Sequence, residues 1–177
     1  AMHAVWTEPS EDQRAGTERH RFLQRAHQNC PAEALEAIPE DAPWRTQCEA
    51  LVEHLEDIPA GEYELAFAYD VGRDTARPLG AWIDRAYSVE PSEVSGTADL
   101  ICAPSASRDR WLVVDFKGDE EVPASAKNLQ LGMYALCVAR VHGADAIDVA
   151  IAYLPRGGGI RWDRATLGAF ELAAVAD

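Results

Sequence analysis

The sequence of 177 residues predicts a single α/β domain in which a central β-sheet is flanked by helices. Apolar runs at residues 111–114 and 147–154 indicate buried strands. An apolar stripe at helical spacing over residues 44–58 indicates an amphipathic helix that packs one face on the core. A chain of this length buries a substantial core, so we expect one domain spanning residues 1–177.

Three helices are predicted before the first strand, after an irregular lead-in over residues 1–10. Residues 10–13 match a capping box, so the first helix should begin there and run to about Asn29. Pro31 opens a short helix, and Pro43 opens a longer one that runs to about Ile58. The solvent face of this third helix is acidic, and we interpret the helix as structural.

Strands should follow. The first covers residues 63–69, with Glu64 on the face opposite Tyr63. We then expect a hairpin tip at 72–77, an edge strand at 79–83 and a strand at 94–102. Asp99 interrupts this last strand, and a buried aspartate must be paired, hydrogen-bonded or bound to a metal.

The central strand ends in two ionisable residues. Asp115 and Lys117 alternate with Phe116, so both point to the same face of the sheet. A carboxylate beside an ammonium suits a hard metal ion with a proton-transfer or charge-stabilising group. An ordinary ion pair at a strand end would give the same local pattern.

The remaining chain predicts an acidic loop, a helix, and two further strands before a final helix. The helix carries Gln130 and Tyr134 one turn apart on one face, where they could equally satisfy core hydrogen bonds. The expected elements are the loop at 118–123, the helix at 124–142 closed by Gly143, the strand at 147–154, a turn at 156–159, a short strand at 160–162, and a helix capped by Asp163.

Composition limits the possible compartments and partners. Hydrophobic residues make up 47% and charged residues 26%, and no apolar run could span a bilayer, so we expect a cytoplasmic protein without a membrane partner. Four scattered cysteines offer no zinc knuckle or disulfide framework. The net charge of −14 argues against a nucleic-acid role, but residues 30–64 contribute −9 of it and could form a solvated face.

Five short motifs follow one another along the predicted elements. They are Gly16–His20 on the first helix, the strand glutamate Glu64, Gly96–Asp99, Asp115–Lys117, and Gln130–Tyr134. In this order and on these elements they resemble the PD-(D/E)xK nuclease superfamily and within it the RecB-like exonuclease branch. The resemblance covers roughly residues 14–155 and implies a restriction-endonuclease-like core with a mixed central sheet.

The resemblance implies a catalytic set and a metal site. Asp99 and Asp115, from adjacent strands, can converge on one Mg²⁺ or Mn²⁺, which would neutralise a scissile phosphate and activate a water. By resemblance the carbonyl of Phe116 and the ring of His20 are further ligands, and Glu64 holds the metal directly or through water. The catalytic residues would be Glu64, Asp99, Asp115 and Lys117, the metal-binding residues His20, Glu64, Asp99, Asp115 and Phe116, and the substrate-binding residues Gln130, Tyr134 and Lys127.

Lysine usage supports a special role for Lys117. Only Lys117 and Lys127 among sixteen basic residues are lysines, and lysine, unlike arginine, can lose its proton when buried. Gly118 stands where many relatives have a small hydroxyl residue, so by this resemblance we expect one substrate contact to be missing. The cysteines lack the C-terminal cluster of the iron-sulfur relatives, so no iron-sulfur cluster is expected.

We therefore predict a metal-dependent deoxyribonuclease, with exonuclease action chosen by family analogy. A separate helicase or a recombination or phage protein would supply any motor or loading function. Two alternatives remain at this stage. One is a catalytically silent nuclease-fold module that binds nucleic acid or a partner protein. The other is a structural protein in which the same residues form a buried salt-bridge network.

Overall fold

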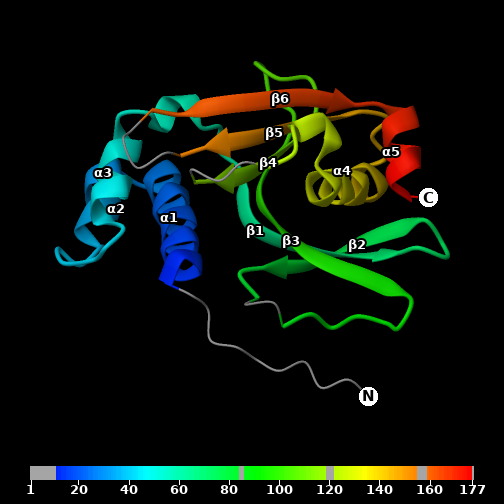
Figure 1. Ribbon diagram of the computed structural model, residues 1–177, viewed down its shortest axis with the longest axis horizontal. Helices are drawn as coiled ribbons and strands as arrows, with labels where there is room; N and C mark the ends of the chain where they lie inside the picture. Colours follow the sequence, from blue (N-terminus) through cyan, green and yellow to red (C-terminus); the bar gives the residue numbers. More distant parts are fainter. Residues whose placement is uncertain (1–10, 84–85, 119–121, 155–158, 177) are drawn as a thin grey trace.

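The computed structural model describes residues 11–83, 86–118, 122–154 and 159–176 (Figure 1). The predicted lead-in at 1–10, the acidic residues 119–121 and most of the glycine turn at 156–159 lie outside these ranges. No helix in the described ranges is long and apolar enough to cross a lipid bilayer.

A six-stranded mixed sheet forms the centre of the molecule, in the order β2-β1-β3-β4-β5-β6 (Figure 1). β4 and β5 pair in parallel and all other neighbours pair antiparallel, which confirms the mixed sheet. The helix between β4 and β5 is the crossover that a parallel pair requires. The strands are β1 (Glu62–Asp70), β2 (Thr75–Ala81), β3 (Glu93–Cys102), β4 (Leu112–Lys117), β5 (Ile147–Tyr153) and β6 (Arg161–Leu167).

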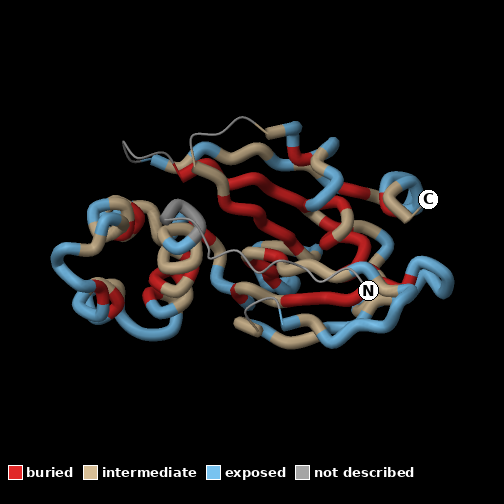
Figure 2. Tube along the Cα trace, turned by 60° about the horizontal axis from the view of Figure 1, so that its bottom comes forward, coloured by how far each residue is buried: buried red, intermediate tan, exposed pale blue. Residues whose placement is uncertain are grey.

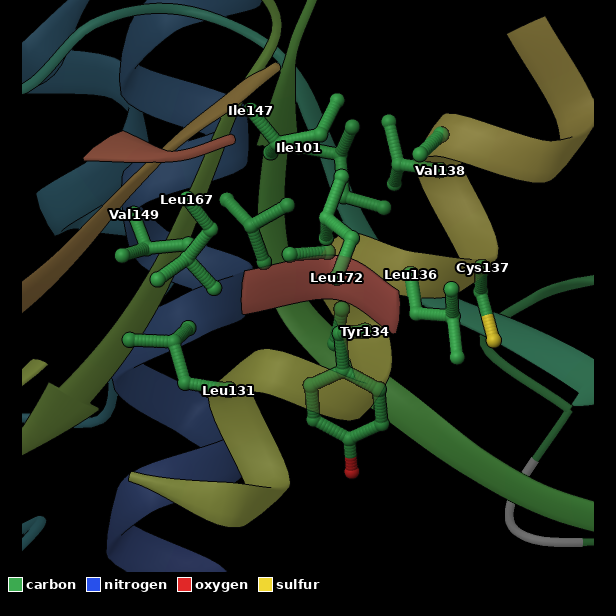
Figure 3. Close-up of a cluster of buried hydrophobic side chains, with 14 of the residues drawn as sticks. Ile101, Leu131, Tyr134, Leu136, Cys137, Val138, Ile147, Val149, Leu167 and Leu172 are labelled. Atoms are coloured by element: carbon green, nitrogen blue, oxygen red, sulfur yellow. The ribbon is translucent and has the colours of Figure 1, made fainter. Parts of the chain in front are cut away.

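Helices cover both faces of this sheet. The α1 side buries apolar residues of the N-terminal helices against Leu112, Val114 and Phe116 of β4. The α4 side buries Val113 and the cluster shown in Figure 3 beneath α4 and α5. Buried residues are concentrated in the strands and on the sheet-facing sides of the helices (Figure 2). The helices are α1 (Glu11–Gln28), α2 (Pro31–Glu36), α3 (Arg45–Val52), η1 (Leu55–Asp57), η2 (Ser125–Lys127), α4 (Leu129–His142) and α5 (Ala169–Ala176).

Two predicted helices have different bounds in the structure. The helix expected over 43–58 is split, because α3 ends at Val52 and the 3₁₀ turn η1 completes the segment. The helix expected from residue 124 begins at Leu129, where the Asn128 side chain accepts a hydrogen bond from the Leu131 amide at 3.0 Å. Its predicted end is confirmed, because Gly143 adopts a left-handed C-cap with φ of 64°.

The prediction that Asp163 caps a final helix is wrong. Asp163 lies within β6, which continues to Leu167, and its carboxylate accepts hydrogen bonds from the Ser125 amide at 2.9 Å and hydroxyl at 3.0 Å. It therefore holds η2 against the sheet. At the other edge β2 begins at Thr75, earlier than predicted, although its position as an edge strand is confirmed.

The acidic segment, residues 30–64, lies on the surface, as its composition suggested. All its carboxylates apart from Glu64 are exposed, and most belong to α2, α3 and the turns between them. α2 and α3 pack against α1, at the end of the sheet away from α4 and α5 (Figure 1). Three of the four cysteines are buried: Cys48 and Cys102 lie on the α1 side and Cys137 on the α4 side.

Candidate metal and catalytic site

Three carboxylates occupy one row across the middle of the sheet. The pairs Tyr63 with Leu100 and Leu65 with Ala98 place Glu64 opposite Asp99 on β1 and β3. The β3–β4 ladder ends at Leu100 and Val114, so Asp99 and Asp115 form the next opposed position. Neighbouring strands lie about 4.8 Å apart, and like charges directly opposite destabilise a sheet. The repulsion among these three carboxylates must be offset by positively charged groups.

Glu64 breaks the regular alternation of β1. Its φ is 53°, in the left-handed region that non-glycine residues rarely adopt. Tyr63 consequently packs on the α1 side, whereas Phe67 packs on the α4 side. The prediction that Glu64 points away from Tyr63 is wrong, because both side chains contact histidines of α1.

His20 is held between two of the carboxylates. Its Nδ1 lies 2.5 Å from Glu64 Oε1, and its Nε2 lies 3.9 Å from Asp99 Oδ2. Burial alone would lower the pKa of His20, but the Asp99 charge and the Glu64 hydrogen bond raise it overall. With Nδ1 bonded to Glu64, Nε2 is the ring atom that faces Asp99. This carboxylate–histidine arrangement is typical of metal-binding histidines.

Asp99 connects the histidine to the central strand. Its Oδ2 accepts a hydrogen bond of 2.8 Å from the Phe116 amide, beyond the point where the β3–β4 ladder ends. Burial raises the pKa of Asp99, although His20 and the Phe116 amide oppose that shift. His20, Glu64 and Asp99 each offer one ligand atom, and these atoms lie within 4.8 Å of one another.

Asp115 and Lys117 complete the site from β4. Lys117 Nζ lies 2.8 Å from Asp115 Oδ2 and donates a hydrogen bond of 3.0 Å to Oδ1. Within the described chain, the buried Oδ2 accepts no hydrogen bond of acceptable geometry. Burial, and then the Asp99 charge, raises the pKa of Asp115 to about 6 against the opposing effect of Lys117. A buried carboxylate oxygen that accepts no hydrogen bond is suited to bind a metal ion.

These donors fit a divalent cation of the Mg²⁺ or Mn²⁺ type. Carboxylate oxygens with one imidazole nitrogen match the preferences of such ions. His20, Glu64 and Asp99 offer ligand atoms that already lie together, and Asp115, which faces Asp99 from β4, would complete the coordination of the ion. Phe116 contributes to the site through its amide, and the role of its carbonyl as a ligand stays a prediction.

The α4 pair lies beside the same site. Gln130 Nε2 donates a hydrogen bond of 3.0 Å to Tyr134 Oη. Burial raises the pKa of Tyr134, the Gln130 hydrogen bond opposes this, and the charges of Asp99 and Asp115 add to the rise. A Cβ on Gly96 would lie 2.8 Å from Tyr134 Cε1, so the glycine permits the close approach of β3 to α4.

Lys127 is a predicted substrate-binding residue that the structure places apart from the acidic row. Lys127 is exposed in η2, and no hydrogen bond or ion pair in the described chain joins it to the acidic row, so its substrate role stays a prediction.

Trp82 supports the site but was not predicted from the sequence. Its φ is 57°, and its amide donates a 3.1 Å hydrogen bond to the Glu64 carbonyl. It thereby fixes the unusual backbone of Glu64, and no residue pattern signals a tryptophan in that conformation.

Comparison with known proteins gives the family and the fold of the chain. The profile of the PD-(D/E)XK nuclease superfamily matches residues 2–166. No curated protein matches the sequence. A crystal structure at 2.19 Å of a candidate exonuclease from Eubacterium rectale superposes with a TM-score of 0.52 and 11% identity. It covers 97% of this chain, which spans 64% of that protein, and the likeness shows a shared fold. The chain belongs to the PD-(D/E)XK nuclease superfamily.

Proposed function

We propose that this protein is a Mg²⁺- or Mn²⁺-dependent deoxyribonuclease of the RecB-like branch that acts as an exonuclease. The observation that carries the proposal is the row of Glu64, Asp99 and Asp115, with His20 at one end and Lys117 at the other. Burying three carboxylates beside only two cationic side chains is costly unless they also bind a metal ion. A hydrolytic metal site accounts for all five side chains.

Each residue has a defined task in this proposal. A divalent cation would supply positive charge to the scissile phosphate and lower the pKa of an attacking water. Asp99 and Asp115 hold that ion, and Glu64 orients the His20 ring toward it. Lys117, whose side chain is 18% exposed beside Asp115, orients the water or stabilises charge that develops on the phosphate. Water oxygen then replaces the leaving oxygen on phosphorus, and the leaving oxygen takes up a proton.

Substrate contacts are assigned to the edge of the site. The exposed Gln130 side chain and the Tyr134 hydroxyl can meet the DNA backbone, with Lys127 adding charge from η2. The fold neighbour described as a candidate exonuclease supports the choice of exonuclease over endonuclease action. A separate helicase, recombination or phage protein would deliver the DNA.

A cleavage assay tests the function. End-labelled single- and double-stranded DNA, and RNA of the same sequence, are incubated with Mn²⁺ or EDTA and wild-type protein, Lys117→Ala or Arg110→Ala. Arg110 is the matched control because it precedes the other end of β4. We expect Mn²⁺-dependent mononucleotide or short products from DNA, a loss of about 10²–10⁴-fold in Lys117→Ala, and wild-type rates in Arg110→Ala.

Other outcomes would contradict parts of the proposal. Internal cuts that give a ladder of long fragments would contradict exonuclease action, and preferred RNA cleavage would contradict the DNA assignment. Mn²⁺ binding without cleavage of any substrate would favour a nuclease-fold module that binds without cutting. The exposed acidic side chains of α2 and α3 are the feature that such a module would explain best.

A further inference from the structure

A second row of side chains crosses the sheet beside the catalytic row. Lys117 pairs with Tyr153 on β5, and Tyr153 pairs with Arg161 on β6. The preceding row on these strands runs through Asp115, Ile151 and Asp163. Because strand side chains alternate, positions two residues apart share a face. Arg161 therefore lies on the same face and at the same end of the sheet as Lys117.

Arg161 is held in place by an aromatic ring. Its Cζ lies 3.7 Å from the ring centroid of Tyr153, which is only 7% exposed. Arg161 itself is exposed. A guanidinium stacked on a buried ring loses conformational freedom but keeps its planar array of N–H donors at the edge. The arginine is thus pre-organised to bind an anion.

The charge of Arg161 is not neutralised within the described chain. No ion pair joins it to a carboxylate there, and the neighbouring Asp163 is occupied by the two hydrogen bonds from Ser125. Six other arginines of this acidic protein pair with carboxylates, namely Arg21, Arg45, Arg73, Arg77, Arg110 and Arg140. Arg161 is therefore a fixed positive charge beside an otherwise acidic site.

We propose that Arg161 binds a backbone phosphate of the DNA strand that is being cut, displaced from the scissile phosphate. This assignment rests on the nuclease function proposed above. Two strand spacings separate Lys117 from Arg161, about 10 Å, and a DNA strand carries a phosphate for every 3.4 Å of helix rise. A phosphate a few nucleotides from the cut can reach Arg161, and guanidinium binds phosphate in a bidentate manner.

The same strand supplies a matched control. Arg164 lies over the Trp162 ring at 4.6 Å, so it is also an arginine stacked on an aromatic residue. Trp162 packs against the cluster on the α1 side of the sheet, whereas Tyr153 belongs to the α4 side. Removing Arg164 therefore takes away the same charge and the same kind of contact from the opposite face.

DNA binding is measured by fluorescence anisotropy on the full chain, with Ca²⁺ replacing Mn²⁺ to prevent cleavage. We expect Arg161→Ala to weaken binding about 5- to 20-fold and to reduce the slope of log K against log salt by about one. Arg161→Lys should recover part of the affinity. Arg164→Ala should stay within about twofold of wild type. Equal effects of the two alanine variants would overturn the assignment.

Kinetics separates a phosphate contact from a structural effect. With Mn²⁺ and a long DNA substrate, Arg161→Ala should raise KM about 5- to 20-fold while kcat changes less than about threefold. A p-nitrophenyl ester of one nucleotide is too short to reach Arg161, so wild type and Arg161→Ala should hydrolyse it equally. A parallel loss on this short ester would show a structural role and overturn the assignment.

The two proposals can fail separately. If the wild type cleaves DNA and Arg161→Ala binds and cleaves it equally well, the Arg161 assignment is contradicted and the nuclease function stands. If the wild type neither cleaves nor binds DNA while Mn²⁺ raises its melting temperature, the DNA function is contradicted and the Arg161 assignment with it.

Discussion

At the scale of single residues, the site depends on charges that the fold alone would not tolerate. Asp99 and Asp115 face each other on adjacent strands, and burial raises the pKa of both. His20 and Lys117 offset only part of this cost. A cation bound as proposed above would balance the remaining negative charge and stabilise the protein.

The Asp115 carboxyl gives a pH dependence of known sign. Its folded-state pKa of about 6 lies above the ordinary 3.8, so protonation favours the folded state. This contribution is full below about pH 3.8 and is lost as the pH rises through about 6. In EDTA, the melting temperature of the wild type should fall more steeply between about pH 5 and 7.5 than that of Asp115→Asn. Parallel curves for the two proteins would contradict the shifted pKa, and Mn²⁺ should reverse the loss in wild type.

Sequence reasoning identified the residue types at the site but not their geometry. Asp115, Lys117 and Asp99 were found because charged residues interrupt apolar strands. The left-handed backbone of Glu64, fixed by Trp82, could not be predicted, since neither residue type favours that conformation. Arg161 also lay outside every motif, because its role depends on strand pairing between β4, β5 and β6.

At the scale of elements, the contact between β3 and α4 sets the position of Gln130 and Tyr134, the pair proposed to bind substrate. Gly96 allows the Tyr134 ring to lie against the β3 backbone. This contact fixes Gln130 and Tyr134 relative to Asp99, three residues further along β3. Helix and strand are thus joined at the edge of the site.

A methyl group at Gly96 tests this contact. Gly96→Ala would place Cβ 2.8 Å from Tyr134 Cε1 and 3.0 Å from its hydroxyl, so Tyr134 or β3 must move. We expect a loss of about 1–3 kcal/mol in the free energy of unfolding by urea. Gly118→Ala is the control, because nothing lies within 4 Å of its Cβ position and it should be unchanged. Equal stabilities would show that the contact is loose.

Element bounds were predicted well where a cap or a long apolar run marks them. α1, β5 and the Gly143 end of α4 follow such signals. β6 was cut short in the prediction because Asp163 resembles a helix N-cap, whereas its carboxylate actually binds Ser125 of a distant segment. Contacts between segments far apart in the sequence decide such cases, and local patterns do not encode them.

At the scale of the whole molecule, charge is unevenly distributed. Most exposed carboxylates of residues 30–64 lie on α2, α3 and nearby turns, which pack beside α1 at the end of the sheet away from α4 (Figure 1). Lys117 and Arg161 lie together at one end of the α4 face. Arg161 therefore places one exposed positive charge beside the acidic row of a protein whose net charge is −14.

In the proposed nuclease, the metal site and the active site are the same site. The most direct test titrates Mn²⁺ while recording both the melting temperature and the initial rate of DNA cleavage. We predict that the two curves reach half-saturation at the same Mn²⁺ concentration. In Glu64→Gln both should shift together to about 10- to 100-fold higher concentration, because the group that orients His20 is weakened. Glu62→Gln, at the exposed start of β1, should shift neither. Cleavage that persists in EDTA, or a Glu64→Gln shift in one curve only, would contradict the account.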